Sequence, residues 1–188
     1  MDPDREPFSE EALRSATVGA LEPLSDRIRL VEYDLRWPGL YEREAERVRK
    51  ALGEGALRIE HTGSTSVPGL AAKPIIDMLL VVADSADEDS YLPHLERAGY
   101  VLRIREPGWH EHRMFRGIDP AVNLHVHTLG CPEIDRMLTF RDRLRTDAGE
   151  RLLYERAKRE LAEKDWKYVQ NYADAKSYVI EEIIARTR

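Results

Sequence analysis

The run Ile75–Val82 constrains the fold more than any other part of the chain. Its sequence, IIDMLLVV, is apolar at every position except Asp77. A strand that is apolar at consecutive positions has both of its faces covered, so this run predicts a central strand of a sheet. A carboxylate inside such a strand is costly unless it is paired, hydrogen-bonded or bound to a metal ion. Asp77 is therefore a candidate functional residue.

The flanking patterns predict the other elements of a single domain. We expect further strands over residues 27–33, 56–60, 100–105, 112–117 and 121–128. We expect helices over residues 10–16, 37–52, 88–98, 132–145, 150–163 and 172–185. This order predicts an α/β (α+β) fold, with a mixed sheet flanked by helices and a helical C-terminal third. We assign residues 26–188 to one domain and residues 1–25 to a peripheral N-terminal extension.

Charge, cysteine content and hydropathy exclude several classes of protein. The chain has 29 Lys and Arg against 35 Asp and Glu, a net charge of −6, so it lacks the basic surface that duplex nucleic acid requires. The single cysteine, Cys131, cannot form an intramolecular disulfide. The longest apolar stretch, residues 78–83, is far shorter than the roughly 20 residues that span a membrane. The acidic N-terminus also lacks the apolar region of a secretory signal. We expect a cytoplasmic protein.

The loop before the buried strand is a candidate phosphate site. It reads HTGSTSVPGLAAKP and contains Gly63, Ser64 and Thr65. Small residues let backbone N–H groups approach a phosphate closely, and hydroxyl groups add further donors. A plain surface turn is the alternative, but the buried acid Asp77 follows thirteen residues after Ser64 and favours a site. Lys73, near the end of the loop, joins the candidate phosphate-binding residues.

A second candidate site lies on the strand predicted over residues 121–128. Asn123, His125 and His127 alternate with apolar residues and therefore share one face. Two imidazoles at this spacing, with Asp77 beside them, would favour Zn²⁺, Mn²⁺ or Fe²⁺ over Mg²⁺. His61 is either a third imidazole or an anchor of the loop. The alternative for this face is a set of solvated, hydrogen-bonded histidines.

Two further histidines and the cysteine have structural interpretations. His110 and His112 repeat the alternation in the segment WHEHR, where an edge hairpin is the favoured interpretation. Cys131 precedes a proline at a helix start and has no evident base beside it in the sequence. We therefore do not assign it a nucleophilic role.

Basic residues fall within the apolar sectors of the C-terminal helices. On a helical wheel, Arg141 and Arg145 lie among the apolar residues of the helix over 132–145, and Lys176 does so in the last helix. Residues 136–167 also carry ten Lys or Arg against seven Asp or Glu. Such side chains either extend to solvent and pair with acids such as Asp77, or form a cationic pocket for phosphate or carboxylate.

Four segments of the sequence resemble the GrpB family. They are IEHTGSTSVPGLAAKPIID (residues 59–77), HRMF (112–115), NLHV (123–126) and FRDRLR (140–145). The resemblance covers roughly residues 28–187. It implies the nucleotidyltransferase-like fold, with its Gly-Ser turn followed by an acidic strand. In some bacteria a similar domain is joined to dephospho-coenzyme A kinase.

The sequence departs from the pattern of active nucleotidyltransferases at one position. Transfer with two divalent ions needs acids at i and i+2 on one strand, because both carboxylates then face the metals. The first acid would be Asp77, but the second position holds Leu79. Leucine has no oxygen ligand for Mg²⁺.

These observations predict a nucleotidyltransferase-like protein that binds a nucleotide or another phosphorylated small molecule. If it is catalytic, the reaction would be metal-dependent nucleotidyl or phosphoryl transfer, with Mg²⁺, Mn²⁺ or Zn²⁺ as the candidate metal. The first alternative is a non-catalytic ligand-binding or interaction domain that kept the fold and lost the second acid. The second is a metal-dependent hydrolase that uses the His and Asp side chains.

Overall fold

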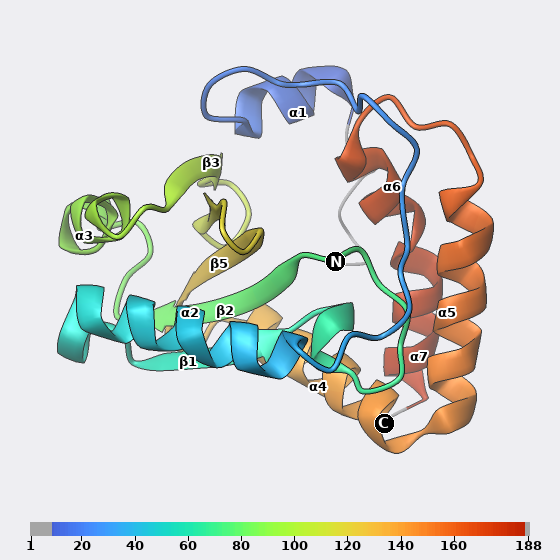
Figure 1. Ribbon diagram of the computed structural model, residues 1–188. Helices are drawn as coiled ribbons and strands as arrows, with labels where there is room; N and C mark the ends of the chain where they lie inside the picture. Colours follow the sequence, from blue (N-terminus) through green and yellow to red (C-terminus); the bar gives the residue numbers. More distant parts are fainter. Residues whose placement is uncertain (1–8, 187–188) are drawn as a thin grey trace.

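The computed structural model describes residues 9–186 and contains a five-stranded mixed sheet (Figure 1). Its strands are listed in chain order: β1 Arg58–Thr62, β2 Ile76–Val82, β3 Val101–Glu106, β4 His112–Gly117 and β5 Val122–Thr128. The spatial order is β1-β2-β5-β4-β3. Strands β2 and β5 are parallel and the other neighbours are antiparallel. The mixed α/β sheet flanked by helices is confirmed, and β2 lies inside it with a strand on each side.

Helices cover the sheet and form the C-terminal third of the chain. They are α1 Glu10–Ala16, α2 Trp37–Leu52, α3 Leu92–Arg97, α4 Pro132–Thr146, α5 Ala148–Ala162, α6 Val169–Ala175 and α7 Ser177–Ala185. Short 3₁₀ helices occupy Gly53–Gly55, Ser64–Ser66 and Glu88–Ser90. In Figure 1, α5, α6 and α7 stand together beside the sheet. None of the helices within residues 9–186 has both the length and the apolar character needed to cross a lipid bilayer.

The two faces of β2 pack against different layers. Ile76, Met78, Leu80 and Val82 belong to the main core, together with residues of α2 and α3. Successive side chains of a strand point to opposite faces, so Asp77, Leu79 and Val81 lie on the other side. There Leu79 and Val81 pack against Ile134 and Leu138 of α4. Asp77, at the start of the strand, lies beyond this apolar contact.

Residues 27–33 do not form the predicted strand. The only pairing there is an isolated bridge between Val31 and Ala72. Instead, Ile28 and Leu30 pack against Leu161 and Tyr172 of the C-terminal helices. Extended backbone with apolar side chains thus crosses the helical layer and does not enter the sheet.

Two predicted helices have different limits in the structure. The helix predicted over 88–98 begins as the 3₁₀ turn Glu88–Ser90, and α3 starts only at Leu92. The helix predicted over 172–185 is divided into α6 and α7 at Lys176, whose N–H bonds back three residues to the carbonyl of Ala173. Such i−3 bonds tighten the end of a helix and interrupt its regular hydrogen bonding.

The segment over residues 9–25 joins the sheet to the C-terminal helices. Leu13 of α1 is buried, and Thr17 pairs with Ile104 of β3. Further along, the N–H of Leu24 donates to the carbonyl of Lys167, just before α6. The blue trace in Figure 1 follows this path from α1 toward α6. We call residues 9–25 the N-terminal strap.

Candidate functional site

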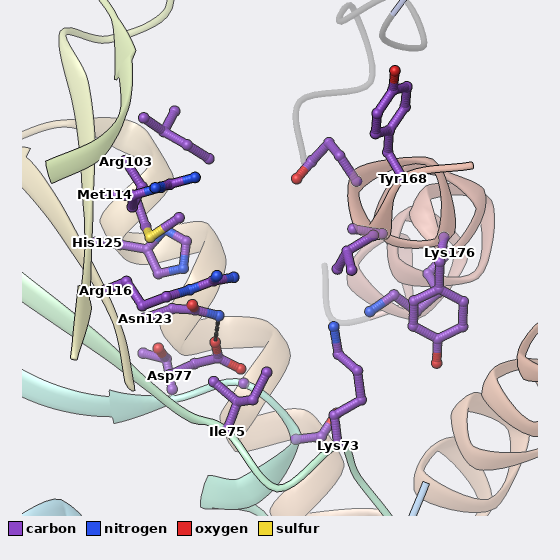
Figure 2. Close-up of a pocket in the computed structure, with 18 of the residues that line it drawn as sticks. Lys73, Ile75, Asp77, Arg103, Met114, Arg116, Asn123, His125, Tyr168 and Lys176 are labelled. Atoms are coloured by element: carbon purple, nitrogen blue, oxygen red, sulfur yellow. Dashed lines mark hydrogen bonds between the residues drawn. The ribbon is translucent and has the colours of Figure 1, made fainter. Parts of the chain in front are cut away.

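A cavity of about 670 Å³ lies between the sheet and the C-terminal helices. One wall is the sheet face that carries Asp77, Asn123 and His125, and the opposite wall comes from α5, α6 and α7. Figure 2 shows these two walls facing one another across the open space. The N-terminal strap adds part of the lining. The volume of the cavity lies within the usual range for small-molecule sites, about 300–1,000 Å³.

Asp77 and Gly63 fit against each other at the base of the cavity. The Asn123 amide donates to Asp77 Oδ1 over 2.9 Å, because the two residues are opposite in the parallel register of β2 and β5. Gly63 has a φ of 63°, and a Cβ on it would lie 2.3 Å from Asp77 Oδ2. Only glycine satisfies both constraints. The Gly-Ser turn is therefore held directly against the carboxylate.

The two hydroxyl groups after Gly63 have different surroundings. Ser64 Oγ accepts a hydrogen bond from Lys158 Nζ over 3.0 Å and lines the cavity. Thr65 Oγ1 donates to the Ile75 carbonyl over 3.2 Å and lies 3.0 Å from His61 Nε2. Ser64 thus connects the turn to α5, while Thr65 and His61 hold the loop to the strand.

Three lysines reach the cavity from separate elements. Lys73 follows the loop, Lys158 belongs to α5 and Lys176 separates α6 from α7. Lys73 Nζ and Lys176 Nζ lie 5.7 Å and 4.7 Å from the centroid of the Tyr172 ring, within cation–π range. Figure 2 shows both side chains pointing into the cavity. Together, Lys73, Lys158 and Lys176 form what we call the lysine cluster.

The lysine cluster has little negative charge to balance it. Burial and the neighbouring Lys176 lower the pKa of Lys73 to about 8 and that of Lys158 to about 7. Burial also lowers the pKa of Lys176. Asp77 acts on all three ammonium groups at longer range, and Glu155 and Asp174 add to it at Lys158 and Lys176 respectively. Desolvation and like charge both disfavour their protonated forms.

Arg141 and Arg145 lie outside the cavity lining. Arg141 is buried and donates to Glu60 Oε2 over 2.8 Å and to the His61 carbonyl over 3.1 Å. Arg145 donates to the Ser66 carbonyl over 3.0 Å. Both arginines point inward, as the helical wheel indicates, but their side chains hydrogen-bond to β1 and to the loop and do not line the cavity. The structure therefore brings Lys73 and Lys176 together with Asp77 and leaves these two arginines apart.

Of the predicted imidazole ligands, His125 and His127 line the cavity and His61 does not. Burial lowers the pKa of His127 to about 3 and that of His61 to about 4, so both rings are neutral at pH 7. His127 Nδ1 lies 3.6 Å from Cys131 Sγ. Within residues 9–186, no three His, Cys, Asp or Glu side chains are grouped as a metal site would require.

The donor set at Asp77 does not fit a pair of divalent ions. The position two residues along β2 is Leu79, which is fully buried against α4. The residue opposite Asp77 is Asn123, whose amide already donates to the carboxylate. One carboxylate and one neutral amide are too few oxygen ligands of the kind that bridge two Mg²⁺ ions.

Sequence reasoning missed Lys158 and Arg116. Lys158 is only 2% exposed and lies on the apolar face of α5, between Tyr154 and Leu161. The helical-wheel argument applied to Lys176 would have found it. Arg116, on β4, lines the cavity beside Asn123 in Figure 2. No sequence signal distinguishes it from the other basic residues of a strand.

Comparisons with known proteins give consistent matches. The family model described as "GrpB protein" matches residues 27–186. A UPF0157 protein of Halalkalibacterium halodurans is 58% identical over 96% of this chain and 92% of its own length. The crystal structure of the conserved protein GrpB from Enterococcus faecalis has a TM-score of 0.73 and 32% identity, over 85% of this chain and 99% of that one.

A longer relative carries a functional name. The dephospho-CoA kinase of Mycolicibacterium paratuberculosis is 33% identical to this chain. The match covers 70% of this chain but only 39% of the kinase.

Substituting Gly63 should reveal its contact with Asp77. We expect Gly63→Ala to lower the free energy of unfolding by about 2–4 kcal/mol, because the new Cβ adds overpacking to an unfavourable positive φ. Asp77→Ala removes two of the three atoms that the Cβ would meet. Chemical denaturation of the two single variants and the double variant should therefore show a smaller loss for Gly63→Ala when Asp77 is absent. Strict additivity would contradict the contact.

Proposed function

We propose that this chain, which belongs to the GrpB family, uses its cavity to bind a phosphorylated small molecule of nucleotide size. The observation that carries this proposal is the lysine cluster. Three ammonium groups from separate elements face one cavity, and Asp77 is the one acid that acts on all three. A phosphate dianion would offset the repulsion that the cluster otherwise carries.

The turn at Gly63 complements this charge. In the proposal, Ser64 donates its hydroxyl to a phosphate oxygen, from a turn whose position is fixed by the contact of Gly63 with Asp77. Lys158 already contacts Ser64 Oγ over 3.0 Å, so the hydroxyl and an ammonium group act on the same ligand oxygens. Arg116 offers a planar guanidinium on the sheet wall.

The rest of the cavity suits the less polar part of such a ligand. Ile104 and Met114 come from the sheet, and Leu13 and Leu21 come from the N-terminal strap. Apolar walls with a few polar groups at one end are typical of small-molecule sites. A nucleoside or a similar body would place its phosphate at the lysine cluster and its ring under the strap.

The relatives named dephospho-CoA kinase add support from context. In the Mycolicibacterium protein, the part similar to this chain accompanies an enzyme whose name refers to a nucleotide-containing cofactor. A domain that binds phosphorylated molecules would be useful beside such an enzyme. For this chain, we favour binding over two-metal nucleotidyl transfer because Leu79 occupies the place of the second acid.

Removing one ammonium group should weaken binding of a phosphorylated ligand. We expect Lys176→Met to raise the Kd for AMP about tenfold or more, which corresponds to about 1.4 kcal/mol for a lost charge-assisted contact. Isothermal titration calorimetry measures this directly. Lys50→Met is the matched control, because Lys50 lies on the exposed face of α2 and pairs with Glu46. Equal Kd values for the wild type and Lys176→Met would contradict the proposal.

Binding should take up protons from solution at pH 8. A bound phosphate stabilises the ammonium forms and raises the lowered pKa values of Lys73 and Lys158. AMP itself is already doubly ionised at this pH, since its second pKa is about 6. Calorimetry in two buffers of different ionisation enthalpy should give an uptake of about one proton, with affinity falling as pH rises above 7. Proton release, or none exchanged, would contradict this arrangement.

The role of divalent ions separates binding from nucleotidyl transfer. We expect the Kd for AMP to be the same within twofold in Mg²⁺, in Mn²⁺ and in EDTA, because the donors at Asp77 do not fit a pair of ions. Binding that requires Mg²⁺ or Mn²⁺ and disappears in Asp77→Ala would instead favour metal-dependent transfer. Tightly held Zn²⁺ that is lost in His125→Ala would favour the hydrolase.

A further inference from the structure

Two hydrogen bonds connect a buried carboxylate and two imidazoles along one wall of the cavity. Glu106 Oε2 lies 2.7 Å from His112 Nδ1, and His112 Nε2 lies 3.0 Å from His125 Nδ1. The sheet register explains the sequence of contacts. Glu106 is opposite His112 in the pairing of β3 with β4, and His125 is opposite Met114 in the pairing of β4 with β5. Three neighbouring strands thus contribute one group each.

Packing holds the two imidazole rings in place. Glu106 and His112 are buried, with 9% and 5% of their surfaces exposed. The rings of His112 and His125 are nearly parallel, with an interplanar angle of 16°, and the centroid of the His127 ring lies 4.9 Å from that of His112. The Trp109 ring meets His112 edge-on at 5.3 Å. A ring confined in this way keeps its nitrogens directed at fixed partners.

The carboxylate determines which nitrogens carry protons. A carboxylate oxygen accepts hydrogen bonds, so His112 Nδ1 carries the proton in the bond to Glu106. In a neutral His112 ring, Nε2 then has only its lone pair and must accept from His125 Nδ1. Burial lowers the pKa of His125, so that ring is neutral at pH 7.5. Its second nitrogen, Nε2, is then without a proton.

Glu106, His112 and His125 all line the cavity, and His125 shares its strand and face with Asn123, the partner of Asp77. Figure 2 shows His125 on the same wall as Arg116, Asn123 and Asp77. We propose that Glu106 and His112 hold His125 as the Nδ1–H tautomer, so that its Nε2 accepts a hydrogen bond from an O–H or N–H group of the ligand. Glu106 and His112 are positioning residues, and His125 is the contact residue.

This inference rests on the proposed function and narrows the ligand class. The lysine cluster takes the phosphate, and His125 requires a proton donor on the same molecule. Inorganic phosphate or pyrophosphate would occupy only the cationic end. A phosphorylated alcohol, such as a sugar phosphate or a nucleotide with free ribose hydroxyl groups, supplies both parts.

The tautomer is measurable without any ligand. In two-dimensional ¹H–¹⁵N spectra of the ring nitrogens, we expect His125 at pH 7.5 to show a protonated Nδ1 and a bare Nε2. Glu106→Gln replaces an acceptor-only carboxylate with an amide that can either accept from or donate to His112 Nδ1, so both His112 tautomers become populated and part of the His125 proton shifts to Nε2. A wild-type His125 protonated at Nε2, or an unchanged pattern in Glu106→Gln, would overturn the proposal.

A conservative variant tests the contact with the ligand. Asparagine at position 125 keeps an N–H donor toward His112 and removes the acceptor at Nε2. We expect the wild type to bind ribose 5-phosphate about tenfold more tightly than inorganic phosphate, and His125→Asn to abolish that difference without weakening inorganic phosphate. No preference in the wild type, or equal weakening of both probes, would overturn the contact.

The two experiments separate this proposal from the function it rests on. If neither probe binds and Lys176→Met changes nothing, the phosphate-binding function fails whatever tautomer His125 shows. If both probes bind equally through the lysine cluster, the function stands and the role of His125 fails. Thermal unfolding of His125→Asn and Glu106→Gln at wild-type midpoints would exclude simple loss of the fold.

Discussion

The contact between Asp77 and the Gly63 turn is the constraint on which the site depends. A carboxylate at the start of an interior strand needs partners, and the Asn123 amide and the bare backbone of Gly63 surround it. The same contact fixes where the turn lies and therefore where Ser64 meets Lys158. Because β2 also carries the main core on its other face, the site is built directly onto a strand that the core holds in place.

The fold was largely predictable because hydrophobic periodicity reports burial. The helix over Trp37–Leu52 and the strand over His112–Gly117 have the limits that their patterns indicate. Periodicity does not reveal what an apolar residue is buried against, however. The pattern of residues 27–33 predicts a strand, but Ile28 and Leu30 pack on the C-terminal helices while Val31 and Tyr33 pack against the main core. Only the tertiary arrangement distinguishes a paired strand from an extended segment that crosses another layer.

The candidate site was predictable only in part, for a related reason. A helical wheel shows which side chains of a helix point toward the interior. It does not show which group the end of a long side chain contacts there. Arg141 reaches Glu60 behind β1, whereas Lys176 reaches the cavity. Likewise, the contact between His112 and His125 depends on the register of β4 with β5. The alternation of polar and apolar residues within each strand does not determine that register.

The N-terminal strap lies wholly outside the part of the chain that matches the family model, which begins at residue 27. Yet Leu13 and Leu21 of the strap line the cavity opposite the sheet. The cationic end of the cavity is therefore built from family-matched sequence, while its cover is not. Divergence of the cover would allow homologous proteins to discriminate among ligands while sharing one way of holding a phosphate. Under the proposed function, the part of the selectivity that comes from the strap would then be encoded outside the stretch that holds the phosphate, and evolution could alter it independently.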